Sequence, residues 1–253
     1  MAKVSLLGVP TDAQTFEIAI ATLLKWAQPP GMRYVSTCPV YTIMTCVDDP
    51  AVMAAVSGAA MAAADGMPVV WMQRRRGHPE AERVYGPDVM LALCERGVPA
   101  GLGHFLLGGA PGVPQRLAEK LYARFPGLNI AGVHSPPFSD QLDAPDPALV
   151  ALLNDSGANV IWVGLGSPKQ DLWMALYRPL LRAPLLIGVG AAFDMLAGVK
   201  RQAPAWMRGI GLEWLFRLAQ EPGRLGKRYL VHNPRFVWRV VLEELALRGS
   251  RRS

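Results

Sequence analysis

Short apolar runs recur along the chain, and four of them have the length and the flanking residues of buried parallel strands. These four runs are Pro68–Met72, Leu102–Leu107, Val160–Val163 and Leu185–Val189. An earlier stretch, Val4–Val9, is predicted to be the first strand. Closely spaced glycines lie within or directly after the last three of these runs, and glycines let a chain turn sharply where a strand ends.

Segments with apolar residues at helical spacing lie between these runs: Pro50–Ala64, Pro87–Arg96, Pro114–Phe125 and Asp146–Ser156. Asp49 and Asp146 are interpreted as helix N-caps before a proline, and Asp143 as a loop residue. Strands that alternate with helices indicate an α/β fold with a right-handed, doubly wound parallel sheet. Such a sheet binds its ligand at the carboxyl ends of the strands, where the glycines fall here.

The pattern becomes purely helical near residue 204. Helices are predicted over Leu212–Glu221, Arg224–Val231 and Pro234–Leu247, separated by Pro222-Gly223 and by Pro234. We therefore expect two domains, a catalytic domain over residues 1–204 and a helical appendage over residues 205–253.

The charge is concentrated in that appendage. The formal net charge of +6 arises entirely within residues 205–253, which hold ten Lys and Arg and four Glu interspersed with Trp, Tyr and Phe. Basic residues mixed with aromatic ones are typical of a surface that binds an anionic membrane. A solvated helical face that packs on the domain through its aromatic residues is the alternative. Nucleic acid is disfavoured as a partner because no nucleic-acid-binding motif accompanies the charge.

Composition limits the other classes. No apolar stretch is long enough for a spanning helix, and the N-terminus does not resemble a signal peptide. The three cysteines have no metal-ligand spacing and cannot all pair, which favours a reducing cytoplasm. The four histidines are scattered, so no metal site is expected. The Walker A, G-x-S-x-G and dinucleotide-binding fingerprints are absent from the sequence.

One loop carries the clearest chemical signal. The run Val160–Val163 leads through Gly164 and Gly166 into Ser167-Pro168-Lys169-Gln170-Asp171 and then a helical stretch. Glycines allow the backbone to approach an anion, and a helix N-terminus offers unpaired N–H groups, so this loop predicts a phosphate or nucleotide site. Lys169 adds a full positive charge.

Four other features have two interpretations each. Asp65-Gly66 is either a turn between the predicted helix and strand or a carboxylate that acts as a general base. Arg83 is either a surface arginine or a bidentate clamp for a diphosphate. Arg74-Arg75-Arg76 is interpreted as a solvated loop rather than a phosphate site. Phe193-Asp194, after Gly190, begins a helix or orients a ribose or sugar hydroxyl.

Several stretches together resemble one family. VGLGSPKQDLWM, GLEWLFRL and the EP..R….RY pattern, with DGMPVVW and ERVYGPD, are similar to the bacterial WecG/TagA/CpsF glycosyltransferases of family 26 over roughly residues 35–240. The resemblance implies a Rossmann-like domain, a parallel sheet flanked by helices, and a C-terminal helical appendage that covers the active site and attaches to the membrane. It also implies no cofactor and a metal-independent, inverting transfer from a UDP-sugar to a polyprenyl-diphosphate-linked acceptor at the inner face of the cytoplasmic membrane.

The resemblance also implies roles for particular residues. Asp65 matches the family's general base, Arg83 its arginine before the GPD motif, and Thr37 its strand threonine. Cations that would neutralise the diphosphate are Lys169, Arg83 and the appendage residues Arg217, Arg224 and Arg228. The remaining expected substrate contacts are Gly164, Gly166, Gln170, Asp171, Gly190, Phe193 and Asp194.

Two departures from the family pattern stand out. An Asn that usually follows the threonine is absent from Thr37-Cys38-Pro39-Val40-Tyr41, and the usual Glu after Lys-Gln is Asp171. The sequence therefore predicts a peripheral membrane glycosyltransferase without identifying the sugar. A non-catalytic membrane-binding adaptor and a Rossmann-type oxidoreductase are the alternatives. The appendage can pack on its own domain or on a neighbour's, so a homo-oligomer stays open.

Overall fold

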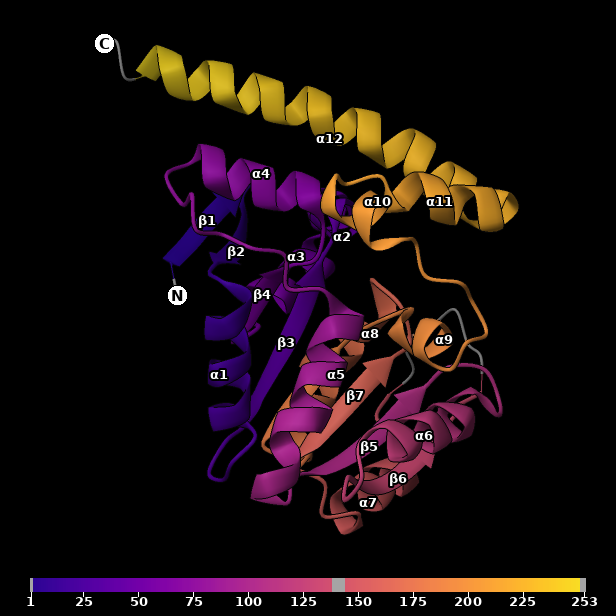
Figure 1. Ribbon diagram of the computed structural model, residues 1–253. Coiled ribbons are helices and arrows are strands. Elements are labelled where there is room, and N and C mark those ends of the chain that lie inside the picture. Colours follow the sequence, from indigo (N-terminus) through magenta and orange to yellow (C-terminus); the bar gives the residue numbers. More distant parts are fainter. Residues whose placement is uncertain (1, 138–143, 251–253) are drawn as a thin grey trace.

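The computed structural model describes residues 2–137 and 144–250, with side chains described as far as residue 247, and its centre is one eight-stranded sheet (Figure 1). Asp143, Arg251 and Arg252 lie outside the described residues. The strands are β1 (Ala2–Leu6), β2 (Val9–Ala13), β3 (Arg33–Cys38), β4 (Met61–Ala64), β5 (Gly103–Gly108), β6 (Asn129–His134), β7 (Val160–Gly164) and β8 (Leu185–Gly188).

The strand order is β1-β2-β4-β3-β8-β7-β5-β6, and every neighbouring pair is parallel except β1 and β2. The helices are α1 (Phe16–Trp26), α2 (Val40–Asp48), α3 (Pro50–Ser57), α4 (Met67–Arg75), α5 (Gly86–Gly97), α6 (Val113–Arg124), α7 (Pro147–Asp155), α8 (Lys169–Tyr177), α9 (Ala192–Leu196), α10 (Ala205–Gly209), α11 (Glu213–Gln220) and α12 (Pro222–Ser250). Two 3₁₀ turns, η1 (Val98–Ala100) and η2 (Arg178–Leu180), follow α5 and α8. The predicted α/β class with a largely parallel sheet is confirmed.

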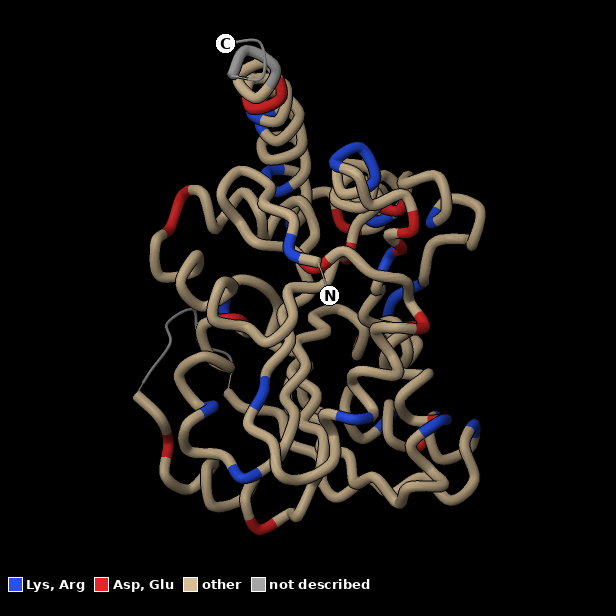
Figure 2. Tube along the Cα trace, turned by 90° about the vertical axis from the view of Figure 1, so that its left-hand side faces the viewer, with Lys and Arg blue, Asp and Glu red and all other residues tan. Residues whose placement is uncertain are grey.

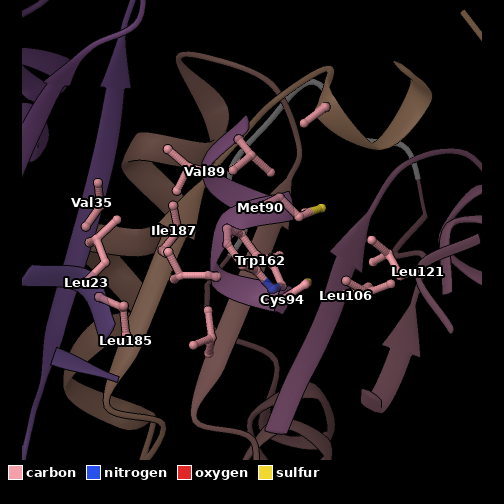
Figure 3. Close-up of a cluster of buried hydrophobic side chains, with 14 of the residues drawn as sticks. Leu23, Val35, Val89, Met90, Cys94, Leu106, Leu121, Trp162, Leu185 and Ile187 are labelled. Atoms are coloured by element: carbon pink, nitrogen blue, oxygen red, sulfur yellow. The ribbon is translucent and has the colours of Figure 1, made fainter. Parts of the chain in front are cut away.

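Helices cover both faces of the sheet, and successive strand residues serve opposite faces. Trp162 and Ile187 pack with α1, α5, α6 and α9, whereas Ile161 and Leu186 pack with α7 and α8. Figure 3 shows the first of these clusters, in which Trp162 lies among side chains of α5. Each fully buried large apolar side chain contributes about 1.5–3 kcal/mol to folding.

The predicted first strand, Val4–Val9, was wrong in its extent. The chain turns at Leu7 and Gly8, both with positive φ, so that β1 and β2 form an antiparallel hairpin instead of one strand. Gly8 adopts that backbone conformation without strain, which is why the turn falls there.

The predictions between residues 50 and 75 were also wrong, because helix and strand were exchanged. The run Pro68–Met72 is part of helix α4, and the strand β4 lies in the alanine-rich end of the predicted helix Pro50–Ala64. All four residues of β4 are buried, and the small side chains of its three alanines leave room for the helices on both faces. Asp65 therefore follows a strand and precedes a helix, the reverse of the predicted order.

The C-terminal helices lie across one end of the sheet (Figure 1). The helix α12 is continuous and contains Pro234, so the prediction of two helices separated there was wrong. Its inner side buries Phe236 and Val240 with residues of β1, α2 and α4. Arg235 pairs with Asp48 at 2.7 Å, so α12 packs on its own chain.

The arginine run at the end of α4 is not the solvated loop that was predicted. Arg75 and Arg76 pair with Glu244 of α12, at 3.4 and 3.0 Å, and Arg76 also pairs with Glu243. The run thus anchors α12 to α4. Two predicted helix caps are confirmed, since the Asp49 side chain accepts from the N–H groups of Ala51 and Val52, and Asp146 from that of Ala148.

Among the described residues, none of the helices combines the length and the apolar composition that a membrane-spanning helix needs. Figure 2 shows that both basic and acidic residues occur in the C-terminal helices. Several of the basic residues counted in the sequence are thus engaged by acids of the same chain, Arg208 with Asp88 for example, at 3.4 Å.

Candidate active site

A cavity of about 350 Å³ lies at the carboxyl ends of the central strands, beneath α11 and the first turns of α12. Twelve of the fourteen predicted site residues line it. They are Thr37, Asp65, Arg83, Gly164, Gly166, Gln170, Gly190, Phe193, Asp194, Arg217, Arg224 and Arg228. Residues far apart in the sequence therefore meet here, as expected where parallel strands end side by side.

Lys169 and Asp171 are not among the described residues that line the cavity. Asp171 is completely buried below the loop, where burial raises the pKa of its carboxyl to about 6, although the hydroxyls of Ser36 and Ser167 act in the opposite direction. Its position favours a role in holding the loop over a direct contact with a substrate.

Several glycines allow the strand ends to meet closely. A Cβ on Gly108 would lie 2.6 Å from the main-chain carbon of Gly164, and one on Gly164 would lie 2.9 Å from the Phe193 ring. The Gly109 N–H donates to the Gly164 carbonyl at 3.1 Å. Side chains at these positions would force β5, β7 and α9 apart.

Two polar side chains tie the loops around the cavity together. Gln170 is 1% exposed and accepts from the Gly190 N–H at 2.9 Å, so it braces the loop after β8 against α8. Thr37, near the end of β3, donates to the Gly188 carbonyl at 2.9 Å. These contacts favour positioning roles for both residues.

Asp65 lies directly after β4 and lines the cavity. Its carboxyl is 17% exposed, and burial raises its pKa to about 7 against the opposing effect of Arg83. A carboxyl with that pKa is partly ionised at neutral pH and can accept a proton, as a general base requires.

Arg83 is held beside Asp65 by the extended segment before α5, because Val84 N–H donates to the Ala64 carbonyl at 2.9 Å. The Arg83 guanidinium donates to the Asp65 carbonyl oxygen at 3.2 Å and lies 3.9 Å from the centre of the Tyr85 ring. Its Nη1 lies 2.7 Å from a carboxylate oxygen of Glu213.

The C-terminal helices bring a group of cations to the same cavity. Arg228 lies 4.0 Å from the centre of the Tyr41 ring, and burial, followed by repulsion from Arg217 and Arg224, lowers the pKa of its guanidinium. Lys200, before α10, pairs with Asp194 at 2.7 Å and with Glu221 at 3.1 Å. Cations that repel one another around a cavity favour the binding of an anion.

The sequence analysis missed several cavity residues: Tyr41, Tyr85, Lys200, Glu213, Trp214, Tyr229 and Asn233. Glu213 stands within the GLEWLFRL motif, yet its acidic side chain among basic residues was the only available signal. Nothing local indicates that it reaches Arg83.

The described residues hold no group of three or more His, Cys, Asp and Glu side chains that suits a metal ion. The cavity is lined by the buried carboxyl of Asp65, by Arg83 that pairs with it, and by the arginines of α11 and α12. The carboxyl can activate a hydroxyl, and the arginines can neutralise a phosphate leaving group.

Comparison with models of known protein families finds a match over residues 4–250. The matching model is described as the glycosyl transferase WecG/TagA/CpsF family. The match includes the sheet, the cavity and the C-terminal helices, so it covers the whole site described above.

Proposed function

Because the chain belongs to the WecG/TagA/CpsF family of glycosyl transferases, which build cell-surface polymers, we propose a specific transfer reaction for it. The donor is a UDP-sugar and the acceptor a polyprenyl-diphosphate-linked saccharide. The reaction inverts the anomeric centre and needs no metal ion.

The observation that carries this proposal is that Asp65 and the arginines of α11 and α12 line one and the same cavity. The acceptor hydroxyl oxygen attacks the anomeric carbon while Asp65 takes its proton. The bond from that carbon to the diphosphate oxygen breaks, and its electron pair leaves with UDP. Attack from the side opposite the leaving group inverts the centre.

The cations supply the charge that the departing diphosphate requires. Arg217, Arg224 and Arg228 line the cavity with Lys200, and fixed positive groups in a partly buried site stabilise developing negative charge strongly. In this proposal they perform the neutralisation that a divalent metal performs in other transferases.

The outer surface of the C-terminal helices supports peripheral binding to the inner face of the cell membrane. Exposed apolar residues recur along one side of α12 at helical spacing: Leu230, Val237, Trp238, Val241, Leu242 and Leu245. Trp206 and Ile210 of the preceding segment are exposed as well. Apolar side chains with Trp, flanked by Lys227 and Arg239, suit an anionic lipid interface.

The experiment that tests this function is a donor screen with purified full-length protein. A short-chain polyprenyl-diphosphate-linked sugar serves as acceptor, in detergent and with EDTA present. Transfer from one UDP-sugar that is lost in Asp65→Asn is the expected result. An absolute requirement for added divalent metal would contradict the metal-independent mechanism, and the absence of transfer from any UDP-sugar would contradict the donor class.

A further inference from the structure

Glu213, the first residue of α11, places an acidic side chain in the lining of the cavity beside Arg83. It is 7% exposed, and its carboxylate lies 2.7 Å from Nη1 of Arg83. The Tyr85 hydroxyl donates to it at 3.1 Å, and Gln202 donates to that hydroxyl at 3.4 Å. The role proposed above for Asp65 leaves this buried carboxylate unexplained.

Arg83 is shared between two carboxylates. One edge of its guanidinium faces Asp65, with Nη2 3.5 Å from the carboxylate, and the other edge faces Glu213. The Tyr85 ring lies against the guanidinium plane. Without α11, Arg83 would keep Asp65 as its acidic partner and lose the second anchor that fixes its orientation.

The shared arginine influences the proton affinity of Asp65. After burial, the charged groups that act on the Asp65 pKa are Arg83 and Arg217, which lower it, and Glu213, which raises it, while the Gly86 N–H lowers it further. A second carboxylate on the same guanidinium leaves less positive charge to stabilise ionised Asp65, so Asp65 stays the stronger base.

We propose that Glu213 is a positioning residue that couples the docking of α11 to the reactivity of Asp65, by holding Arg83 away from full pairing with that carboxylate. The inference rests on the proposed function, because it assigns Asp65 as the base. The helix α11, which carries Arg217, thus also sets the reactivity of Asp65 through Glu213, so that the docking of one helix completes both the base and the group of cations.

The test compares Glu213→Gln, Glu213→Asp and the control Glu244→Gln in the full chain. Glu244 is a matched acid, since it also joins the C-terminal helices to arginines of the catalytic part, and it does not line the cavity. In Glu213→Gln, the acid limb of the pH profile of kcat/KM is expected to move to lower pH by at least about half a unit. We expect kcat to fall about tenfold with little change in the donor KM.

Glu213→Asp keeps the charge, so its acid limb should stay near that of the wild type, and Glu244→Gln should leave both the limb and kcat unchanged. A loss of kcat in Glu213→Gln without movement of the acid limb would mean that Glu213 has only a structural role, which would overturn the coupling. An unchanged profile with unchanged kcat would overturn it as well.

Amide hydrogen exchange tests the docking without activity, so that failure of the proposed function is distinguished from failure of this inference. Exchange in residues 213–220 and in residues 81–86 should speed up in Glu213→Gln and stay unchanged in Glu244→Gln. If the wild type transfers no sugar, the proposed function is wrong and the exchange result alone decides the docking. Unchanged exchange in Glu213→Gln would overturn the inference.

Discussion

At the residue scale, the sequence pointed to twelve of the residues that line the cavity but not to the contacts between them. Asp65 and Arg83 were singled out from short motifs, yet only the fold shows that Arg83 lies between Asp65 and Glu213. Asp171 stands in the most distinctive motif and is nevertheless buried below the cavity. A motif identifies a loop, whereas the direction of each side chain depends on the packing around it.

The first prediction concerns the proton that Asp65 accepts. Burial raises the pKa of its carboxyl to about 7, and only the ionised form acts as a base, so wild-type kcat/KM should rise as the pH increases through about 7. Asp65→Asn should lower kcat by about a hundredfold to ten-thousandfold. Initial rates from pH 5 to 9 measure both. A wild-type rate that is flat across this range would contradict Asp65 as the base.

The second prediction concerns stability and follows from the same carboxyl. Its pKa is 3.8 in the reference state and about 7 in the folded protein, so the folded state holds the proton more tightly. The stability that this proton affinity contributes is fully present below pH 3.8 and is lost as the pH rises through 7. Asp65→Asn should therefore raise the melting temperature relative to the wild type more at pH 8 than at pH 5. Thermal unfolding at the two pH values measures this, and an equal shift at both would contradict the raised pKa.

At the element scale, helices with clear helical spacing and strands rich in Val, Leu and Ile were predicted correctly, whereas an alanine-rich strand and a helix with a continuous apolar run were not. The helices α5 and α6 and the strands β7 and β8 appear within one or two residues of their predicted bounds. β4 was missed because four buried residues, three of them alanine, have no strand signature, and α4 was missed because its apolar run looks like a strand. β3 carries buried Ser36 and Thr37, whose polarity hides a central strand.

The third prediction concerns Pro234, which lies inside α12 and cannot donate the hydrogen bond that a helix interior expects. Replacing it with Ala supplies that N–H, so Pro234→Ala should slow amide exchange in the preceding and following turns of α12. We expect the free energy of local opening to rise by about 1–3 kcal/mol. Faster exchange in this variant would contradict the prediction and would indicate that α12 needs proline at position 234 to pack on α2.

At the scale of the whole molecule, the sequence gives the concentration of positive charge in residues 205–253, and the structure shows where several of these cations lie. Arg208 and Arg235 pair with acids of residues 1–204, and Arg217, Arg224 and Arg228 line the cavity. Some of these cations therefore form ion pairs that attach the C-terminal helices to the rest of the chain, and others line the cavity. The division into two domains at residue 204 stays a prediction.

The fourth prediction concerns the outer apolar side of α12. Trp238 and Leu245 are 64% and 60% exposed, so replacing both with Ser should disturb the core little while weakening binding to anionic vesicles by about tenfold or more. Tyr122→Ser, at 48% exposure on α6, is the matched control and should bind as the wild type does. Co-sedimentation with vesicles of phosphatidylglycerol and phosphatidylcholine measures this at low and high salt. Equal binding by the double variant would contradict a membrane role for this surface.

The sequence by itself determined the α/β class, the glycine-bounded strand ends, the helical C-terminal segment and the family, because these depend on local periodicity and contiguous motifs. Only the tertiary structure decided the exchange of helix and strand around Asp65, the continuity of α12 and the sharing of Arg83 between Asp65 and Glu213. These depend on burial and on contacts between residues of different elements, as far apart in the sequence as Arg83 and Glu213. Desolvation and ion pairing of that kind exist only after the chain has folded.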